Sequence, residues 1–397
     1  MNYLLIIILF ILCLYDYLKY KQLLSPTLIF NAIWFVTLLL YELKLSYLQQ
    51  DLSNRTILIF YLCVISFNIT IFLLKKINYK PLNILKSKYH SSFSLKNKLK
   101  MAKIISIVIF LLEVLYSGGV PLIWKILGIN KTYFDFGISS LNGAFCGLII
   151  LLGAYSFGQK NLDKYLYLTM GLLMLSRQVI ISIIIEGLLF CYISKKIKLS
   201  FKKVLLILTC LFLAFTVLGN FRSGSNEMNR VFKAKEEFVN IPTSIKWVYS
   251  YMTFSVSNFN NLVSMTNGNV NHGTTIMEEL LPSVVLDKIN IKKNFSSSYL
   301  VSLNYTVSTY LPALYLDFGI IGISVFNIFI AFLGYRLYLK TRLNDVASDN
   351  DAMCYSIYAH NIIFLFFINM FFYLPIIVQF FYSLIIFGTN SDKKVGD

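Results

Sequence analysis

Arginine is the residue type whose placement first suggests chemistry in this chain. The sequence has 30 Lys and only 6 Arg, yet Arg55, Arg177, Arg222 and Arg230 fall in segments that we expect to face away from the cytoplasm. A guanidinium binds phosphate through a fixed pair of donors, whereas the ammonium of lysine is enough to set membrane topology. We therefore take Arg177, Arg222 and Arg230 as candidates for binding a phosphate-bearing substrate. The alternative is that Arg177 and Arg222 only extend from helix ends toward water.

Three carboxylates form the second group of candidates. Glu113 and Glu186 lie inside apolar runs, and Asp317 begins one. A charge at mid-bilayer costs at least about 2.5–3.5 kcal/mol, so these side chains should face the interior of a helix bundle or water. Asp317 has a structural alternative, because Asp-Phe-Gly opens a predicted helix and Asp is a favoured N-cap. For Glu113, pairing with an arginine and a catalytic or substrate-binding role weigh equally, and we expect Glu186 to be structural.

Histidine adds one further candidate. His272 lies in a polar segment, where an acid–base or sugar-binding role competes with simple exposure, while His90 falls in a basic loop and His360 in an apolar run, where we expect a hydrogen-bonded core residue. No metal-ligand spacing of His or Cys is present, so we expect no metal. The sequence also lacks a P-loop, a Rossmann glycine pattern, HExxH and GxSxG, which disfavours nucleotide-driven chemistry. A site outside the cytoplasm would then need an energy-rich substrate already at the membrane, such as a sugar-bearing lipid diphosphate.

The elements that must position these residues are membrane helices. The chain is 57% hydrophobic and 16% aromatic, with a mean hydropathy of +0.67. Its continuous apolar runs approach the ~20 residues that cross a bilayer and lack the alternation of barrel strands. We predict an all-α polytopic membrane protein with about eleven crossings, near residues 2–18, 27–43, 56–74, 104–120, 143–158, two short helices within 165–194, 203–221, 317–338, 353–371 and 374–389.

Charge and polarity orient these spans. The net charge is +17, and nine lysines lie between residues 75 and 103 without an acidic residue among them. The positive-inside rule makes this loop cytoplasmic, which explains the charge without a nucleic-acid partner. The remaining lysines then place the N-terminus and one long polar segment outside. The chain is thus expected to have three regions: a helical bundle over 1–221, an external loop region over 222–306, and a second bundle over 307–397.

Several motifs, in this order and topology, resemble the bacterial O-antigen or capsule repeat-unit polymerases, the Wzy family. Glu113 precedes Gly118-Gly119-Val120-Pro121, and Tyr133 to Gly137 follows. Leu175-Ser176-Arg177-Gln178 opens a span, and Asn220-Phe221-Arg222-Ser223-Gly224 ends one. The most specific match is Tyr305-Thr306-Val307-Ser308-Thr309 followed by Tyr315-Leu316-Asp317-Phe318-Gly319-Ile320-Ile321-Gly322, with Gly334 later in that span. The resemblance covers residues 104–340.

The resemblance implies an integral glycosyltransferase of the bacterial cytoplasmic (inner) membrane whose active site faces outside. Such enzymes move a growing glycan from undecaprenyl diphosphate to a new undecaprenyl-diphosphate-linked repeat unit, without a nucleotide sugar and without a cofactor. Flippase and chain-length regulator proteins would be its partners. Arg177, Arg222 and Arg230 would neutralise the diphosphate, and Tyr305 and Tyr315 would stack on sugars. The candidates for accepting the proton of the attacking hydroxyl are Asp317, then Glu113, then His272.

Three other functions fit the same sequence. A flippase or transporter of the lipid-linked oligosaccharide would share the substrate and the basic character, but would show more evenly sized spans and shorter loops. An O-antigen ligase-type glycosyltransferase would differ only in its acceptor. A structural partner in polysaccharide assembly would need none of the proposed catalytic groups.

Overall fold

The computed structural model describes residues 2–79, 92–159, 162–195, 225–268, 270–281, 283–289, 298–342 and 347–388. Over these ranges every regular element is a helix, and β pairing is limited to two isolated bridges, Ser46 with Ala234 and Thr309 with Ile368. The predicted all-α class is confirmed. The helices are α1 (Asn2–Tyr20), α2 (Pro26–Glu42), α3 (Asn54–Lys76), α4 (Ser92–Ser117), α5 (Pro121–Ile126), α6 (Leu141–Gly158), α7 (Asp163–Leu173), α8 (Arg177–Ile193), α10 (Ser225–Phe232), α11 (Thr243–Met265), α12 (Thr274–Leu280), α13 (Ser283–Lys288), α14 (Pro312–Lys340), α15 (Asp349–Ile363) and α16 (Leu374–Phe387), with the 3-10 helices η1 (Tyr133–Asp135), η2 (Glu236–Phe238) and η3 (Met370–Phe372).

Four stretches in the described ranges are long and apolar enough to cross a bilayer by length and composition. They are α3, residues Ser94–Ile126 of α4 and α5, α6, and α14. α2 and α16 are apolar but shorter. The predicted span 203–221 lies outside the described residues, and each of the other predicted spans overlaps a helix. Over the residues that the structure describes, the protein is therefore all-helical, with four candidate membrane-spanning helices.

Several boundary predictions are wrong: α4 starts at Ser92 and not near 104, and two further differences concern α15 and α14. Hydrogen bonds at the helix ends explain the one at α15. The predicted span 353–371 is a helix only over Asp349–Ile363. It starts early because the Ser348 hydroxyl accepts a bond from the Asp351 N–H at 3.1 Å. Beyond its end, the Leu365 and Phe366 carbonyls accept bonds from other parts of the chain. The other difference is at α14, which begins at Pro312 and not near 317.

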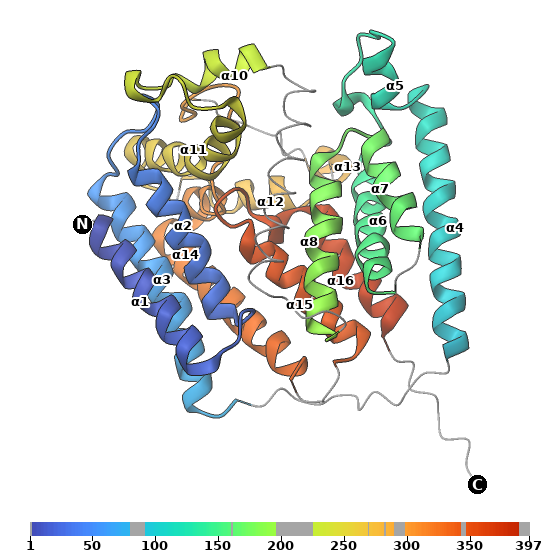
Figure 1. The fold of residues 1–397 in the computed structure, drawn as a ribbon, viewed down its shortest axis with the longest axis horizontal. Coiled ribbons are helices and arrows are strands. Elements are labelled where there is room, and N and C mark those ends of the chain that lie inside the picture. Colours follow the sequence, from blue (N-terminus) through green and yellow to red (C-terminus); the bar gives the residue numbers. More distant parts are fainter. Residues whose placement is uncertain are drawn as a thin grey trace.

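The helices form two neighbouring groups, each with its own apolar core (Figure 1). In one group α1 packs on α2, and α3 packs on α14. In the other, α6 packs on α4, α7, α8 and α16. Helix α15 joins the groups, because it contacts α8 and α16 on one side and α14 and α2 on the other.

Lysine-bearing helix ends gather at one end of the molecule. Lys75 near the end of α3 lies 3.6 Å from Asp16 of α1. Lys96, Lys98 and Lys100 lie in the first turns of α4, and Lys103, further along α4, forms a 2.6 Å ion pair with Asp163. The end of α3 and the start of α4 lie at the bottom of Figure 1, while α5, α10 and α11 lie at the top. A shared basic end is what the positive-inside rule requires of a multi-pass protein.

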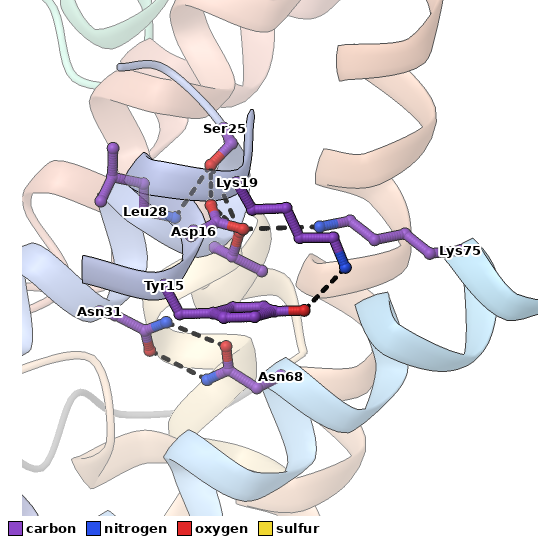
Figure 2. Close-up of polar contacts among 9 residues, drawn as sticks. Tyr15, Asp16, Lys19, Ser25, Leu28, Asn31, Asn68 and Lys75 are labelled. Atoms are coloured by element: carbon purple, nitrogen blue, oxygen red, sulfur yellow. Dashed lines mark hydrogen bonds and ion pairs between the residues drawn. The ribbon is translucent and has the colours of Figure 1, made fainter. Parts of the chain in front are cut away.

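A buried carboxylate fastens the first three helices at this basic end (Figure 2). Asp16 is only 5% exposed. It accepts hydrogen bonds from Ser25 and, at 2.5 Å, from Thr27, in addition to its contact with Lys75. Ser25 also caps α2, since its hydroxyl accepts a bond from the Leu28 N–H at 3.2 Å. The α1–α2 turn is thus held by one charge, and Asp16 has a structural role.

Within its described parts, region 222–306 is largely helical and not an open loop. Two asparagines of α11 fasten this region to the rest of the protein. Asn258 donates to the carbonyls of Tyr305 and Val307 at 2.8 and 2.7 Å. Asn260 accepts from the Ser53 N–H and the Thr56 hydroxyl at 2.9 and 2.8 Å, at the start of α3. Sequence patterns did not separate this buried helix from the polar residues around it, because α11 is rich in Ser, Thr and Asn.

Candidate functional site

A break in α14 creates the surface on which the candidate site is built. At Gly319 the backbone leaves the helical conformation, with φ 60° and ψ −147°. Glycine is the residue that tolerates a positive φ, so the Asp-Phe-Gly sequence permits a break where the apolar run predicts continuity. In the last turn before the break, the Leu316 carbonyl accepts hydrogen bonds from the N–H groups of Val270 and Asn271 at 2.7 and 3.1 Å. The segment leading into α12 is thereby docked on α14.

Asp317 also fastens α12 to α14, just before the break at Gly319. Its Oδ1 accepts the Thr275 N–H at 3.1 Å and its Oδ2 accepts the Ile276 N–H at 2.7 Å, and the residue is 0% exposed. Both donors lie in the first turn of α12, where unpaired N–H groups and the helix dipole favour an anion. The predicted capping of its own helix is therefore wrong, because Asp317 lies inside α14. The carboxylate caps another helix instead.

His272 lies beside this junction. The residue is exposed, with a φ of 49°, in the turn that precedes α12. Its neighbour Asn271 makes the backbone contact with α14 described above. Two of the three proton-acceptor candidates, His272 and Asp317, are therefore brought to one corner of the fold.

Glu279 is a candidate that the sequence analysis missed. It lies on α12, and although the residue keeps exposed surface, burial of its carboxyl group and then the charges of Asp317 and Glu278 raise its pKa to about 7. A carboxyl group that titrates near neutral pH suits general acid–base catalysis. The sequence feature that could have identified Glu279 is the adjacent pair of glutamates inside the short apolar patch 276–285. Asp317 and Glu279 thus differ: the Asp317 carboxylate is bound to the first turn of α12, and the Glu279 carboxyl has a raised pKa.

Arg55 contacts residues that adjoin this corner. Its Nη1 and Nη2 donate to the side-chain and main-chain oxygens of Asn267 at 2.5 and 2.6 Å. Its guanidinium also lies 5.7 Å from the ring centroid of Tyr315. Arg55 and Lys75 are twenty residues apart on α3, which corresponds to about 30 Å, the thickness of the hydrocarbon core. The corner is thus about one bilayer thickness from the basic end.

Arg177 lies at the turn between α7 and α8, apart from the α12–α14 corner. As predicted, it follows the turn between two short helices, α7 and α8. Its guanidinium lies 5.9 Å from the ring centroid of Trp247 on α11, and the neighbouring Gln178 donates to Met370 at 3.5 Å. Because Met370 begins η3, which contacts α12, the Arg177 turn and the α12 corner share a neighbour. Arg230 is exposed on α10, and Arg222 lies outside the described residues.

The remaining candidates are buried. Glu113 is 0% exposed within α4, beside the backbone of Ile138, so its assignment as base or arginine partner stays a prediction. Tyr315 is 0% exposed, and its hydroxyl donates to the Thr266 carbonyl at 3.0 Å. Tyr305 is 4% exposed, and its hydroxyl contacts the sulfur of Met228 at 3.3 Å. Stacking of either tyrosine on a sugar would require its ring to be uncovered.

Comparisons of the chain with protein-family models, with curated proteins and with solved structures find no match.

Proposed function

We propose that this chain is a membrane glycosyltransferase that polymerises undecaprenyl-diphosphate-linked repeat units into O-antigen or capsular polysaccharide. One observation carries the proposal: residues distant in sequence, Arg55, His272, Glu279 and Asp317, meet at the α12–α14 corner. The corner lies about one bilayer thickness from the basic helix ends. A substrate presented at the outer face would therefore arrive at the corner. The motif resemblance supplies the substrate class.

The proposed reaction is transfer of a glycan between two lipid-linked partners. The acceptor hydroxyl attacks the anomeric carbon of the growing chain, a new glycosidic C–O bond forms, and the C–O bond to the diphosphate breaks. Glu279, or His272 at the other end of α12, takes the hydroxyl proton. Arg177 and Arg222 stabilise the charge on the departing undecaprenyl diphosphate. Arg55 joins them in this role because it lies at the α12–α14 corner. Asp317 positions α12 and does not itself take the proton.

The proposal includes an eleven-span topology in the bacterial cytoplasmic membrane. The basic helix ends face the cytoplasm, and region 222–306 faces outside, where flippase and chain-length regulator proteins would act before and alongside the enzyme. A reporter fused after the last helix should then fluoresce in the cytoplasm. A reporter inserted near Asn269 should be active outside, and a cytoplasmic signal at that position would contradict the orientation.

The decisive experiment uses purified protein in nanodiscs with a synthetic undecaprenyl-diphosphate-linked repeat unit. The expected product is a ladder of longer lipid-linked glycans. Glu279→Gln should reduce ladder formation by roughly 10²- to 10⁴-fold, the usual contribution of a general base. The matched control is Glu278→Gln, which changes the neighbouring glutamate of the same helix and should keep most activity. Equal ladders from wild type and Glu279→Gln would remove Glu279 from the mechanism, and no ladder from wild type would refute the polymerase assignment.

A flippase or transporter of the same lipid-linked oligosaccharide is the second candidate, and one observation favours it. Glu186 and His360 form a fully buried pair between α8 and α15, and ionisable groups inside membrane bundles often mark proton-coupled pathways. Movement of a labelled lipid-linked oligosaccharide across vesicle membranes without chain growth would support this function. An O-antigen ligase-type enzyme would instead transfer the glycan to a different acceptor and form no ladder.

A further inference from the structure

A carboxyl, an imidazole and a hydroxyl lie in line inside the second helix group. Oε1 of Glu186 is 3.1 Å from Nδ1 of His360, and both side chains are 0% exposed. On the other side of the ring, Nε2 of His360 is 3.1 Å from Oγ of Ser182. Ser182 and Glu186 are one helical turn apart on α8, so the imidazole from α15 bridges two successive positions on one face of α8.

Amide side chains complete the surroundings of this line. Gln379 of α16 lies beside Glu186, and Asn361 of α15 lies beside His360. Asn361 and Gln379 are themselves 0% exposed. Three helices therefore contribute polar groups to one small volume within an otherwise apolar core.

Titratable groups on the neighbouring helices are directed elsewhere: Tyr355 of α15 donates to the Leu24 carbonyl, and Tyr382 of α16 donates to the Ala144 carbonyl at 3.3 Å. On α15, the Tyr358 hydroxyl donates to the Ile330 carbonyl of α14 at 3.0 Å. On α6, the Tyr155 hydroxyl donates to Asp349, at the far end of α15, at 3.0 Å. On α8, Arg177 lies nine residues before Glu186, about 13 Å along the axis. Among the described residues, Glu186 and His360 thus have only each other as a potential charge partner.

Electrostatics and hydrogen-bond direction together select one protonation state. Separating a carboxylate and an imidazolium from water costs several kcal/mol per ion, and the surrounding amides are neutral dipoles that offset only part of it. The Glu186 carboxyl and Nδ1 of His360 are 3.1 Å apart but are not oriented as a hydrogen bond in the structure; in the neutral arrangement, rotation of the carboxyl lets its O–H donate to Nδ1 of His360. Its Nε2–H then donates to Ser182 Oγ, so that every contact in the line has one donor and one acceptor. A carboxylate beside a neutral imidazole would leave a net negative charge in the bundle.

We propose that Glu186, His360 and Ser182 form an intramembrane binding site for a single exchangeable proton, held between the Glu186 carboxyl and Nδ1 of His360. Loss of this proton leaves a buried carboxylate, and gain of another leaves a buried imidazolium. Either change places a net charge between α8 and α15. The inference does not depend on the polymerase assignment, because it rests only on the three helices that build the site.

Infrared spectroscopy of the full chain in nanodiscs tests the carboxyl half of the site. At neutral pH the wild-type protein should show a protonated-carboxyl C=O band that shifts in D₂O and is lost in Glu186→Gln. Glu113→Gln is the matched control, since Glu113 is also fully buried but lies on α4 beside backbone and not beside a histidine. A spectrum unchanged by Glu186→Gln would overturn the proposal.

Nitrogen NMR of the histidine side chains tests the imidazole half without altering the buried site. The chain has three histidines, so His90→Asn and His272→Asn identify their own resonances in a ¹⁵N-histidine-labelled sample and leave that of His360. We expect a neutral ring protonated at Nε2, with Nδ1 as acceptor. An imidazolium, or a neutral ring protonated at Nδ1, would show that the proton is not held as proposed.

Discussion

Replacing Asp317 with asparagine should loosen α12 even though the side chains have nearly the same shape. In the wild type, each carboxylate oxygen accepts one backbone N–H, from Thr275 at 3.1 Å and from Ile276 at 2.7 Å. Asparagine has one acceptor oxygen, so its NH₂ group must face the other N–H. An N-cap of the residue's own helix would tolerate asparagine about as well as aspartate. The arrangement at Asp317, which uses both carboxylate oxygens, should not tolerate asparagine.

The size of the effect follows from the bonds that are lost. A hydrogen bond to a charged group contributes about 1.5–3 kcal/mol. Because Asp317 is 0% exposed, water cannot replace the missing acceptor. Losing one such bond should raise the open fraction of α12 by roughly 10- to 150-fold, since each 1.4 kcal/mol is about a factor of ten.

Hydrogen exchange measured by mass spectrometry on peptides covering residues 270–281 gives the readout. Exchange in Asp317→Asn should accelerate there and stay unchanged in the helices of the second group. Asp135→Asn is a control, because Asp135 accepts the Thr132 N–H at 2.7 Å in a turn of its own. Wild-type exchange over 270–281 in Asp317→Asn would refute the capping role. If exchange does accelerate, loss of activity in this variant cannot be assigned to a missing base.

Three further predictions concern packing, titration and phosphate binding. Gly334→Ala should lower the unfolding temperature, because a Cβ there would lie 2.0 Å from the hydroxyl oxygen of Tyr358, and overpacking costs typically about 1–3 kcal/mol; an unchanged melting curve would contradict this contact. The pKa of Glu279 is raised to about 7, above about 4.3 in an unfolded chain, so the wild type should lose stability as pH rises between these values. Unfolding of Glu279→Gln should lack that part of the pH dependence, and identical pH profiles would argue against the raised pKa. Arg177→Lys and Arg222→Lys should each lose most polymerising activity despite keeping the charge, because an ammonium cannot replace a two-donor fork; normal ladders from both would exclude that role.

The sequence predicted the helices well where an apolar run alone defines them. For α6, the predicted 143–158 and the observed Leu141–Gly158 nearly coincide. Prediction failed where a helix continues past its apolar run, as α4 does by starting at Ser92. It also failed where a long helix such as α11 buries small polar side chains.

The site was only partly predictable, because its contacts join residues that are distant in sequence. Asp317 and His272 were identified as separate candidates, but nothing in the local pattern indicates that one fastens the helix next to the other. In the same way, Glu186 and His360 each had a sound structural interpretation, and only the packing of α8 on α15 makes them a pair. Glu279 was missed because its raised pKa depends first on burial and then on the charge of Asp317, and both depend on the tertiary fold and not on a local sequence window.

The docking of α12 on the break in α14 also constrains how the protein is made. During synthesis, residues 270–281 leave the ribosome before Asp317 and Leu316, the two residues that hold them. Until Asp317 of α14 is in place, α12 lacks its cap, and until residues 305–307 are made, α11 lacks the Tyr305 and Val307 carbonyls that Asn258 binds. The segment must therefore wait, unpaired, for the C-terminal part of the chain. Biogenesis of this protein thus has a late step, in which insertion of one helix completes a region made well before it.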